Sequence, residues 1–194
     1  RRGPQDRRLV VCAHIDTKEN TPGALDNAGG VIVLLLLAEL LAGYDGELGI
    51  EIFVVNGEDY YAAPGEILYL QQNAGRMEQI RLAVNLDAVG HRQGATAFSL
   101  YGCPDEEAVA VRRALSRPGM VEGAAWYQSD HSVFFQQGRP AVALTSDDLS
   151  GLMAEVTHTP QDLPGLVDPA RLVQAADALR DLFLDLERQP QALG

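Results

Sequence analysis

Short apolar segments rich in β-branched residues alternate along this chain with longer segments of helical character. The sequence predicts strands at residues 8–13, 50–55, 80–86 and 140–144, and helices at residues 27–41, 63–73, 105–115 and 169–186. Strands that alternate with helices of this length are typical of a parallel sheet covered by helices on both faces. We therefore expect residues 1–194 to form a single domain, a three-layer α/β/α sandwich with a mostly parallel, mixed central sheet.

Polar side chains able to bind metal follow the first three predicted strands. In chain order they are His14 and Asp16, then Glu58 and Asp59, then Asp87. In open α/β sheets, ligands bind outside the carboxyl ends of the strands. The sequence therefore predicts a functional site at this end of the sheet.

The net charge of −12 argues against nucleic-acid binding and against attraction to anionic lipid surfaces. The longest apolar run, at residues 31–37, is too short to span a bilayer, and Glu39 interrupts the segment that follows it. No signal-peptide pattern is visible, and two distant cysteines, Cys12 and Cys103, imply no disulfide framework, so the sequence indicates no cellular compartment. An acidic chain does suit a site that gathers divalent cations and protonated amines.

Each polar group near these strand ends also has an ordinary structural explanation. His14 with Asp16 suits either a strand-end histidine capped by its neighbour or a metal ligand whose ring that carboxylate orients. Asp26 precedes a predicted helix in a glycine-rich segment and is, by itself, best explained as a helix cap. Glu58 and Asp59, taken alone, are best explained as solvated turn residues.

Two further residues weaken these separate explanations. Asp87 directly follows an apolar run, where an unpaired carboxylate would be costly to bury. His158 lies in a loop before the last predicted helix, with Asp162 in reach as an orienting partner. The chain thus offers two histidines, three aspartates and one spare glutamate, enough for two ligand sets that share one acid. This inventory predicts two zinc ions per chain.

Six motifs occur in an order that strongly resembles the co-catalytic zinc aminopeptidase family: AHIDT, GALDNAGG, NGED, NLDAVG, SDHSVF and THTPQD. That family includes bacterial leucyl aminopeptidases and, more distantly, glutamate carboxypeptidase and glutaminyl cyclase. The resemblance extends from Leu9 to the final helix, and each motif gains its weight from the order of all six. It implies a zinc-peptidase, phosphorylase/hydrolase-like fold.

The resemblance also implies a metal ligand set. His14 and Asp87 would hold one zinc ion, and Asp26 would bridge it to the second. Asp59 and His158 would hold that second ion, although family members commonly have Glu at the position of Asp59. Because Asp is shorter by one methylene, the second ion is expected to sit slightly differently or to bind less tightly.

By the same resemblance, Glu58 would be the general base, Asp16 would orient His14, and the peptide bond from Asp26 to Asn27 would be cis. Family domains usually carry a substantial segment before the first zinc motif, whereas this chain reaches His14 almost at once. We therefore expect the chain to lack an N-terminal part, and its sheet to have an exposed edge or face.

The resemblance implies an aminopeptidase that acts on peptide substrates. Glu58 would take a proton from a zinc-activated water that attacks the scissile carbonyl, and would pass it to the leaving amine. Tyr127 or His131 would help to stabilise the oxyanion. Tyr127 equally fits an aromatic residue at the pocket rim, and His131 equally fits a substrate contact or a hydrogen-bonded structural histidine.

Three alternatives to an aminopeptidase remain open. A glutaminyl cyclase has a similar scaffold with one zinc ion, but a Ser commonly follows the bridging Asp there, whereas Asn27 stands here. A non-catalytic binding module on a peptidase scaffold would keep the fold, but decay should delete ligands. A di-zinc carboxypeptidase or deacylase usually inserts a dimerisation domain, for which the interval from Asp87 to His158 is too short.

Overall fold

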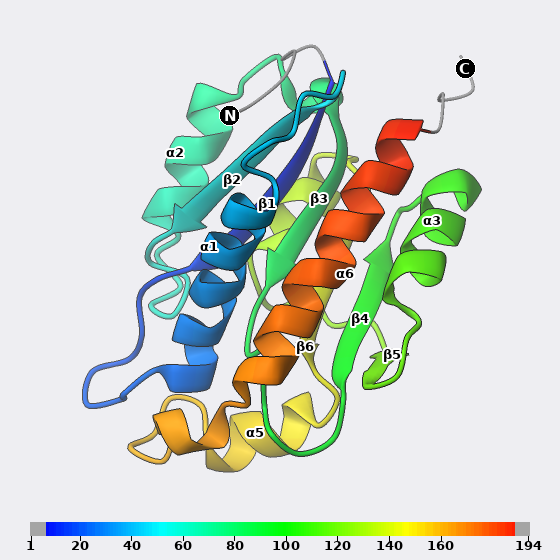
Figure 1. The fold of residues 1–194 in the computed structure, drawn as a ribbon. Helices are drawn as coiled ribbons and strands as arrows, with labels where there is room; N and C mark the ends of the chain where they lie inside the picture. Colours follow the sequence, from blue (N-terminus) through cyan, green and yellow to red (C-terminus); the bar gives the residue numbers. More distant parts are fainter. Residues whose placement is uncertain (1–6, 189–194) are drawn as a thin grey trace.

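The computed structural model describes residues 7–188, which form one six-stranded sheet with helices packed on both of its faces (Figure 1). The strands are β1 (Arg8–His14), β2 (Gly49–Val55), β3 (Ile80–Leu86), β4 (Thr96–Tyr101), β5 (Met120–Glu122) and β6 (Ala141–Ser146). The α-helices are α1 (Gly30–Leu40), α2 (Pro64–Gln72), α3 (Asp105–Leu115), α4 (His131–Gln136), α5 (Leu149–Glu155) and α6 (Pro169–Arg188). Ala24–Gly29 forms a π-helical turn, and Met77–Gln79 and Pro164–Leu166 form short 3₁₀ turns.

The strand order in the sheet is β2-β1-β3-β6-β4-β5. β1 pairs in parallel with both β2 and β3, and β3 pairs in parallel with β6. β4 runs antiparallel to β6 and parallel to β5, which makes the sheet mixed. The predicted α/β sandwich with a mostly parallel sheet is therefore confirmed, and the carboxyl ends of β1, β2, β3 and β6 lie at one end of the sheet.

The side chains of β1 show how the sheet divides the interior into two cores. Leu9, Val11 and Ala13 face the core formed with α1, α3 and α6, while Val10 and Cys12 face the core formed with α2 and α4. Successive side chains of a strand point to opposite faces, and here both faces are covered. Burial on both sides explains why the β1 sequence is continuously apolar rather than alternating.

The helix predicted at residues 27–41 begins later in the structure, at Gly30. Asp26 and Asn27 have non-helical backbone angles within the preceding turn, and the Gly30 N–H donates to Asn27 Oδ1 at 3.1 Å. The asparagine side chain thus closes the turn that positions Asp26 and starts α1. The sequence analysis also missed β4, β5, α4 and α5, because these elements are short or rich in Ala, Ser and Gly.

β2 forms one edge of the sheet, and apolar side chains are exposed around it. Val54 on β2 is 49% exposed, and Leu35 on the neighbouring helix α1 is 67% exposed. Ile32 and Leu40 are further exposed apolar side chains of α1. Within residues 7–188, no helix combines the length and the apolar character required to cross a bilayer.

Candidate metal centre and active site

Three of the predicted ligands converge at the ends of β1 and β3. His14 is the last residue of β1, Asp87 follows β3, and Asp26 lies in the turn before α1. The His14 Nε2 atom lies 3.1 Å from Asp26 Oδ1 and 3.5 Å from Asp87 Oδ1. One nitrogen and two carboxylate oxygens therefore face a common point, the arrangement of a metal-binding cluster.

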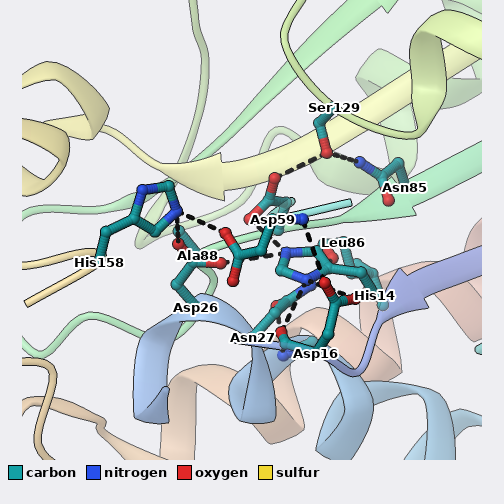
Figure 2. A network of polar contacts seen from close by, with 12 residues as sticks. His14, Asp16, Asp26, Asn27, Asp59, Asn85, Leu86, Ala88, Ser129 and His158 are labelled. Carbon is teal, nitrogen blue, oxygen red and sulfur yellow. Dashed lines mark hydrogen bonds and ion pairs between the residues drawn. The ribbon is translucent and has the colours of Figure 1, made fainter. Parts of the chain in front are cut away.

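Asp26 belongs to a second cluster as well (Figure 2). Its other oxygen, Oδ2, lies 3.2 Å from His158 Nε2, and that nitrogen lies 2.5 Å from Asp59 Oδ1. Asp59 comes from the turn after β2, and His158 from the loop that follows α5. The structure thus brings all five predicted ligands together as two triads with one shared carboxylate.

Several buried atoms of these triads contact one another through ion pairs rather than through well-aligned hydrogen bonds. They are His14 Nε2 and the carboxylate oxygens of Asp59. His14 and Asp59 are fully buried, so these polar atoms are withdrawn from water. Imidazole nitrogens and carboxylate oxygens are ligands that zinc accepts, so this donor set fits metal ions that would complete its coordination.

The pKa values of the metal-free cluster show how strongly its charges interact. Burial acts to lower the pKa of His14, but the carboxylates of Asp26 and Asp87 outweigh it and raise that pKa to about 12. Burial acts to raise the pKa of Asp26, but His14 and His158 lower it to about 2. A protonated His14 therefore balances part of the negative charge of the carboxylates around it.

Asp16 links the end of β1, which carries His14, to the turn that carries Asp59. Its carboxylate does not make the short contact with His14 that we expected from the sequence. Its carboxylate accepts hydrogen bonds from the backbone N–H groups of Gly57 at 2.7 Å and Asp59 at 3.2 Å. His14 Nδ1 lies 3.9 Å from that carboxylate but 3.1 Å from the Asp16 carbonyl oxygen. The backbone carbonyl of Asp16 thus makes the short contact that orients the ring, and the carboxylate fixes the Asp59 turn instead.

Asp162 also differs from expectation. Rather than approaching His158, its carboxylate accepts hydrogen bonds from the backbone N–H groups of Leu25 at 2.7 Å and Asp26 at 3.0 Å. Asn27 holds the other side of this turn, because its Nδ2 donates to the Leu86 carbonyl oxygen at 2.7 Å. The Asp26–Asn27 peptide bond is cis, as the resemblance implied.

Asp87 is held by two residues that the sequence analysis did not single out. The Ser129 hydroxyl donates to Asp87 Oδ2 at 2.7 Å, and Asn85 Nδ2 donates to the Ser129 hydroxyl at 2.8 Å. Asn85 precedes Asp87 by two positions at the end of β3, so both point to the same face of the strand. That spacing was the signal available in the sequence, but nothing local to Ser129 linked it to β3.

Glu58 lies outside both triads and lines the hollow that opens onto them. Burial, followed by the nearby charge of Asp87, raises the pKa of Glu58 to about 8. Apolar walls of the hollow come from Trp126 and from α5, which contributes Leu149 and Met153 on one helical face. A carboxylate near the triads but outside them is placed to exchange protons with a substrate or a water molecule.

The two candidates for oxyanion stabilisation occupy different environments. Tyr127 is 57% exposed, packs edge-on against Tyr101 and lines a second hollow shared with Glu58. His131 is fully buried, and its Nε2 lies 2.7 Å from the Trp126 carbonyl oxygen. Desolvation lowers the pKa of His131, so it suits a neutral, hydrogen-bonded histidine that supports the Trp126 wall. A role for Tyr127 in catalysis stays a prediction.

Several known proteins are similar to this chain over most of its length. "Uncharacterized protein YfbL" of Escherichia coli K12 is 23% identical over 93% of this chain and 68% of its own length. The zinc aminopeptidase BSAP from Bacillus subtilis has a similar fold, with a TM-score of 0.78 and 22% identity over 95% of this chain and 48% of its own. A glutaminyl cyclase from Fimbriiglobus ruber matches with a TM-score of 0.75 and 16% identity over 93% of this chain and 71% of its own.

The chain therefore spans about half the length of the Bacillus subtilis structure that it matches. At these identities the solved structures show a common fold, the α/β sandwich described above. The sequence model of the family described as "Peptidase family M28" matches residues 1–183, which include both triads and Glu58. On that match, the chain belongs to peptidase family M28.

Proposed function

We propose that this chain is a di-zinc metallopeptidase that hydrolyses the N-terminal peptide bond of peptides. The observation that carries the proposal is the pair of triads joined by Asp26. Membership of peptidase family M28 supports peptide-bond hydrolysis. A zinc aminopeptidase with a similar fold supports the choice of metal and of reaction.

His14, Asp87 and Asp26 would hold one zinc ion, and the second would lie between Asp26 and the pair Asp59 and His158. Zinc ions bound there supply Lewis acidity, which polarises the scissile carbonyl and lowers the pKa of an attacking water. The protein's own part is to keep the ligands fixed before the metal arrives. The hydrogen bonds from Leu25 and Asp26 to Asp162 do so for the shared carboxylate.

Glu58 is the residue we assign to proton transfer. It is half-buried, lines the same hollow as Asp26 and Asp87, and belongs to neither triad. As a general base it would accept the proton of the attacking water, and as a general acid it would deliver that proton to the leaving amine. A carboxylate already used as a metal ligand could not do both.

An exopeptidase that acts at the amino end also fits the charge of the site. The hollow is lined by the carboxylates of Asp26 and Asp87, so it attracts the protonated α-amino group of a peptide. The apolar walls formed by Trp126 and Met153 offer contacts for an uncharged side chain.

The test is turnover of aminoacyl anilides and of matched N-acetylated peptides, measured before and after zinc is removed by a chelator. We expect zinc-dependent cleavage of the free-amine substrates and none of the blocked ones. Cleavage of blocked peptides alone would overturn the aminopeptidase assignment. Pyroglutamate formation from N-terminal Gln, with one zinc ion bound, would establish a glutaminyl cyclase, and absence of turnover with two ions bound would establish a binding module.

A further inference from the structure

Glu58 lines two neighbouring hollows, and only the first of them contains metal ligands. The first hollow, described above, is also lined by Asp26 and His158. The second hollow has a volume of about 260 Å³, and its described lining includes Glu66 and Tyr127 but none of the five ligands. The second hollow therefore adjoins the site of proton transfer without belonging to the metal centre.

The position of Glu58 indicates which part of a peptide enters each hollow. In the proposed reaction, Glu58 passes a proton to the amine of the second residue, so that amine must lie within hydrogen-bond reach of Glu58. The first residue lies at the triads, in the first hollow. Since successive side chains of an extended peptide point in opposite directions, the second side chain does not follow the first into that hollow. The other hollow lined by Glu58 is therefore the one that receives it.

We propose that the second hollow binds the side chain of the second residue of the substrate, and that Glu66 and Tyr127 select arginine or lysine at that position. The inference rests on the proposed aminopeptidase activity, and it adds the class of peptide that the site prefers. Three features of the hollow support it: the charge of Glu66, the aromatic ring of Tyr127 and the volume.

Glu66 offers a negative charge to the second hollow. It is partly exposed and lies in the first turn of α2, where the helix dipole favours an anion. Asp130 is almost fully buried, and burial, followed by contact with Glu66, raises the pKa of the Asp130 carboxyl. At neutral pH, Asp130 thus keeps its proton, and the charge of the pair resides on Glu66.

The protein supplies no cation to neutralise that charge. Within residues 7–188, the arginine side chains that form ion pairs do so with acids other than Glu66. The charged side chains in the described lining of the second hollow are both carboxylates, those of Glu58 and Glu66. A basic side chain of the substrate would therefore complete an ion pair with Glu66 that the chain itself does not make.

Tyr127 supplies an aromatic ring to the same hollow. Guanidinium and ammonium groups bind over the face of a tyrosine ring. Tyr127 is exposed, and it contacts Tyr101 edge-on. Tyr61 also lines the hollow, but its ring already lies 4.6 Å from the Nζ atom of Lys18. Tyr127 is thus the ring that is left to contact a basic side chain of the substrate.

The volume of the second hollow suits a long side chain. It is about 260 Å³, whereas that of the first hollow is about 60 Å³. Lysine and arginine carry their charge at the end of a long apolar stem, which packs along a surface while the charged group reaches a polar partner. The larger hollow therefore accommodates the stem as well as the charged group.

The test compares Leu-Arg-amide with Leu-citrulline-amide as substrates of the zinc-loaded full chain, because citrulline has the shape of arginine without its charge. We expect kcat/KM to be about 5-fold higher for the arginine substrate. Glu66→Gln should remove this preference through a higher KM for Leu-Arg-amide, while kcat/KM for the citrulline substrate changes less than about 2-fold. Glu19→Gln, at an exposed acid that lines neither hollow, is the matched control and should keep the preference.

Charge reversal gives a readout that misfolding cannot produce. Glu66→Lys should raise kcat/KM for Leu-Glu-amide about 5-fold relative to Leu-Gln-amide, because the new cation would pair with the glutamate side chain. Tyr127→Leu should lower the preference for arginine about 2- to 5-fold, whereas Tyr127→Phe, which keeps the ring, should retain it.

The outcomes separate this inference from the proposed function. Equal turnover of the arginine and citrulline substrates by the unsubstituted chain, or equal effects of Glu66→Gln on both, would overturn the role of Glu66 and leave the peptidase intact. Absence of turnover of both substrates by the unsubstituted zinc-loaded protein would overturn the proposed function, and this inference with it.

Discussion

The backbone N–H of Asp26 donates a hydrogen bond to the Asp162 carboxylate at 3.0 Å. The carboxylate shared by both triads is thus held in place by a residue from the loop before α6, far away in the sequence. Both Asp162 oxygens are used, because the second accepts from the Leu25 N–H at 2.7 Å. Preorganisation of the metal site therefore depends on this long-range contact.

Asp162→Asn tests this dependence. An amide has a single acceptor oxygen, so one of the two buried N–H groups would lose its partner, and we expect unfolding free energy to fall by about 1–3 kcal/mol. Zinc affinity should fall as well, because Asp26 would be less firmly placed. Chemical denaturation and zinc titration measure the two effects. Asp168→Asn, at an exposed carboxylate that accepts from the Ala170 N–H, should change neither by a comparable amount.

Removal of single ligands should change metal stoichiometry in two distinct ways. His158→Gln is expected to leave one ion per chain, because it removes a ligand of only one triad. Asp26→Ala is expected to weaken both sites, because both triads share that residue. Native mass spectrometry of the zinc-loaded variants counts the ions, and equal losses in the two variants would contradict a bridging role for Asp26.

Glu58→Gln should abolish most turnover without loss of zinc. The amide cannot accept a proton, and general base catalysis contributes about 10²–10⁴-fold to rate, so kcat should fall by that order while metal content stays the same. Anilide hydrolysis and elemental analysis measure both quantities. Glu19→Gln, at an exposed acid in the loop after β1, is the control and should keep full activity.

Metal binding should release protons. The pKa of His14 is raised to about 12 and that of His158 is raised by Asp26, so His14 carries a proton at pH 7 before zinc arrives. Zinc needs a neutral imidazole nitrogen, so binding must expel this proton, and affinity should rise with pH. Calorimetric titration in two buffers of different ionisation enthalpy measures the protons released. A heat of binding that is independent of buffer would contradict the prediction.

In the protein freed of zinc by a chelator, Glu58 should make stability fall as pH rises, whereas zinc affinity should increase with pH. Burial raises the folded pKa of Glu58 to about 8 from an ordinary value of 4.5, so the folded state retains a proton that the unfolded state loses. Stability therefore falls as pH rises from about 4.5 to about 8, and the cost is complete above that range. Glu58→Gln removes this cost. Its Tm should exceed that of the unsubstituted chain at pH 9 but match it at pH 4, whereas Glu19→Gln should show no such divergence.

The sequence located the candidate ligands because of where its apolar runs end. His14 is the last residue of the buried strand β1, and Asp87 directly follows the buried strand β3. Parallel strands bring their carboxyl ends to one end of a sheet. Local pattern was enough for that inference, since strand and helix periodicity are short-range properties. It was not enough for β4 or α5, whose few residues alternate small and polar side chains with apolar ones.

The contacts that hold those ligands could be found only in the tertiary structure. No local pattern links Asp162 to Asp26 or Ser129 to Asp87. Each pair joins segments that are separated in the sequence and meet because the sheet order β2-β1-β3-β6 brings their loops together. The sequence by itself determined which residues are chemically able to bind metal. The fold determined which atoms face one another, because hydrogen bonds and ion pairs act over a few ångströms in space, whatever the distance along the chain.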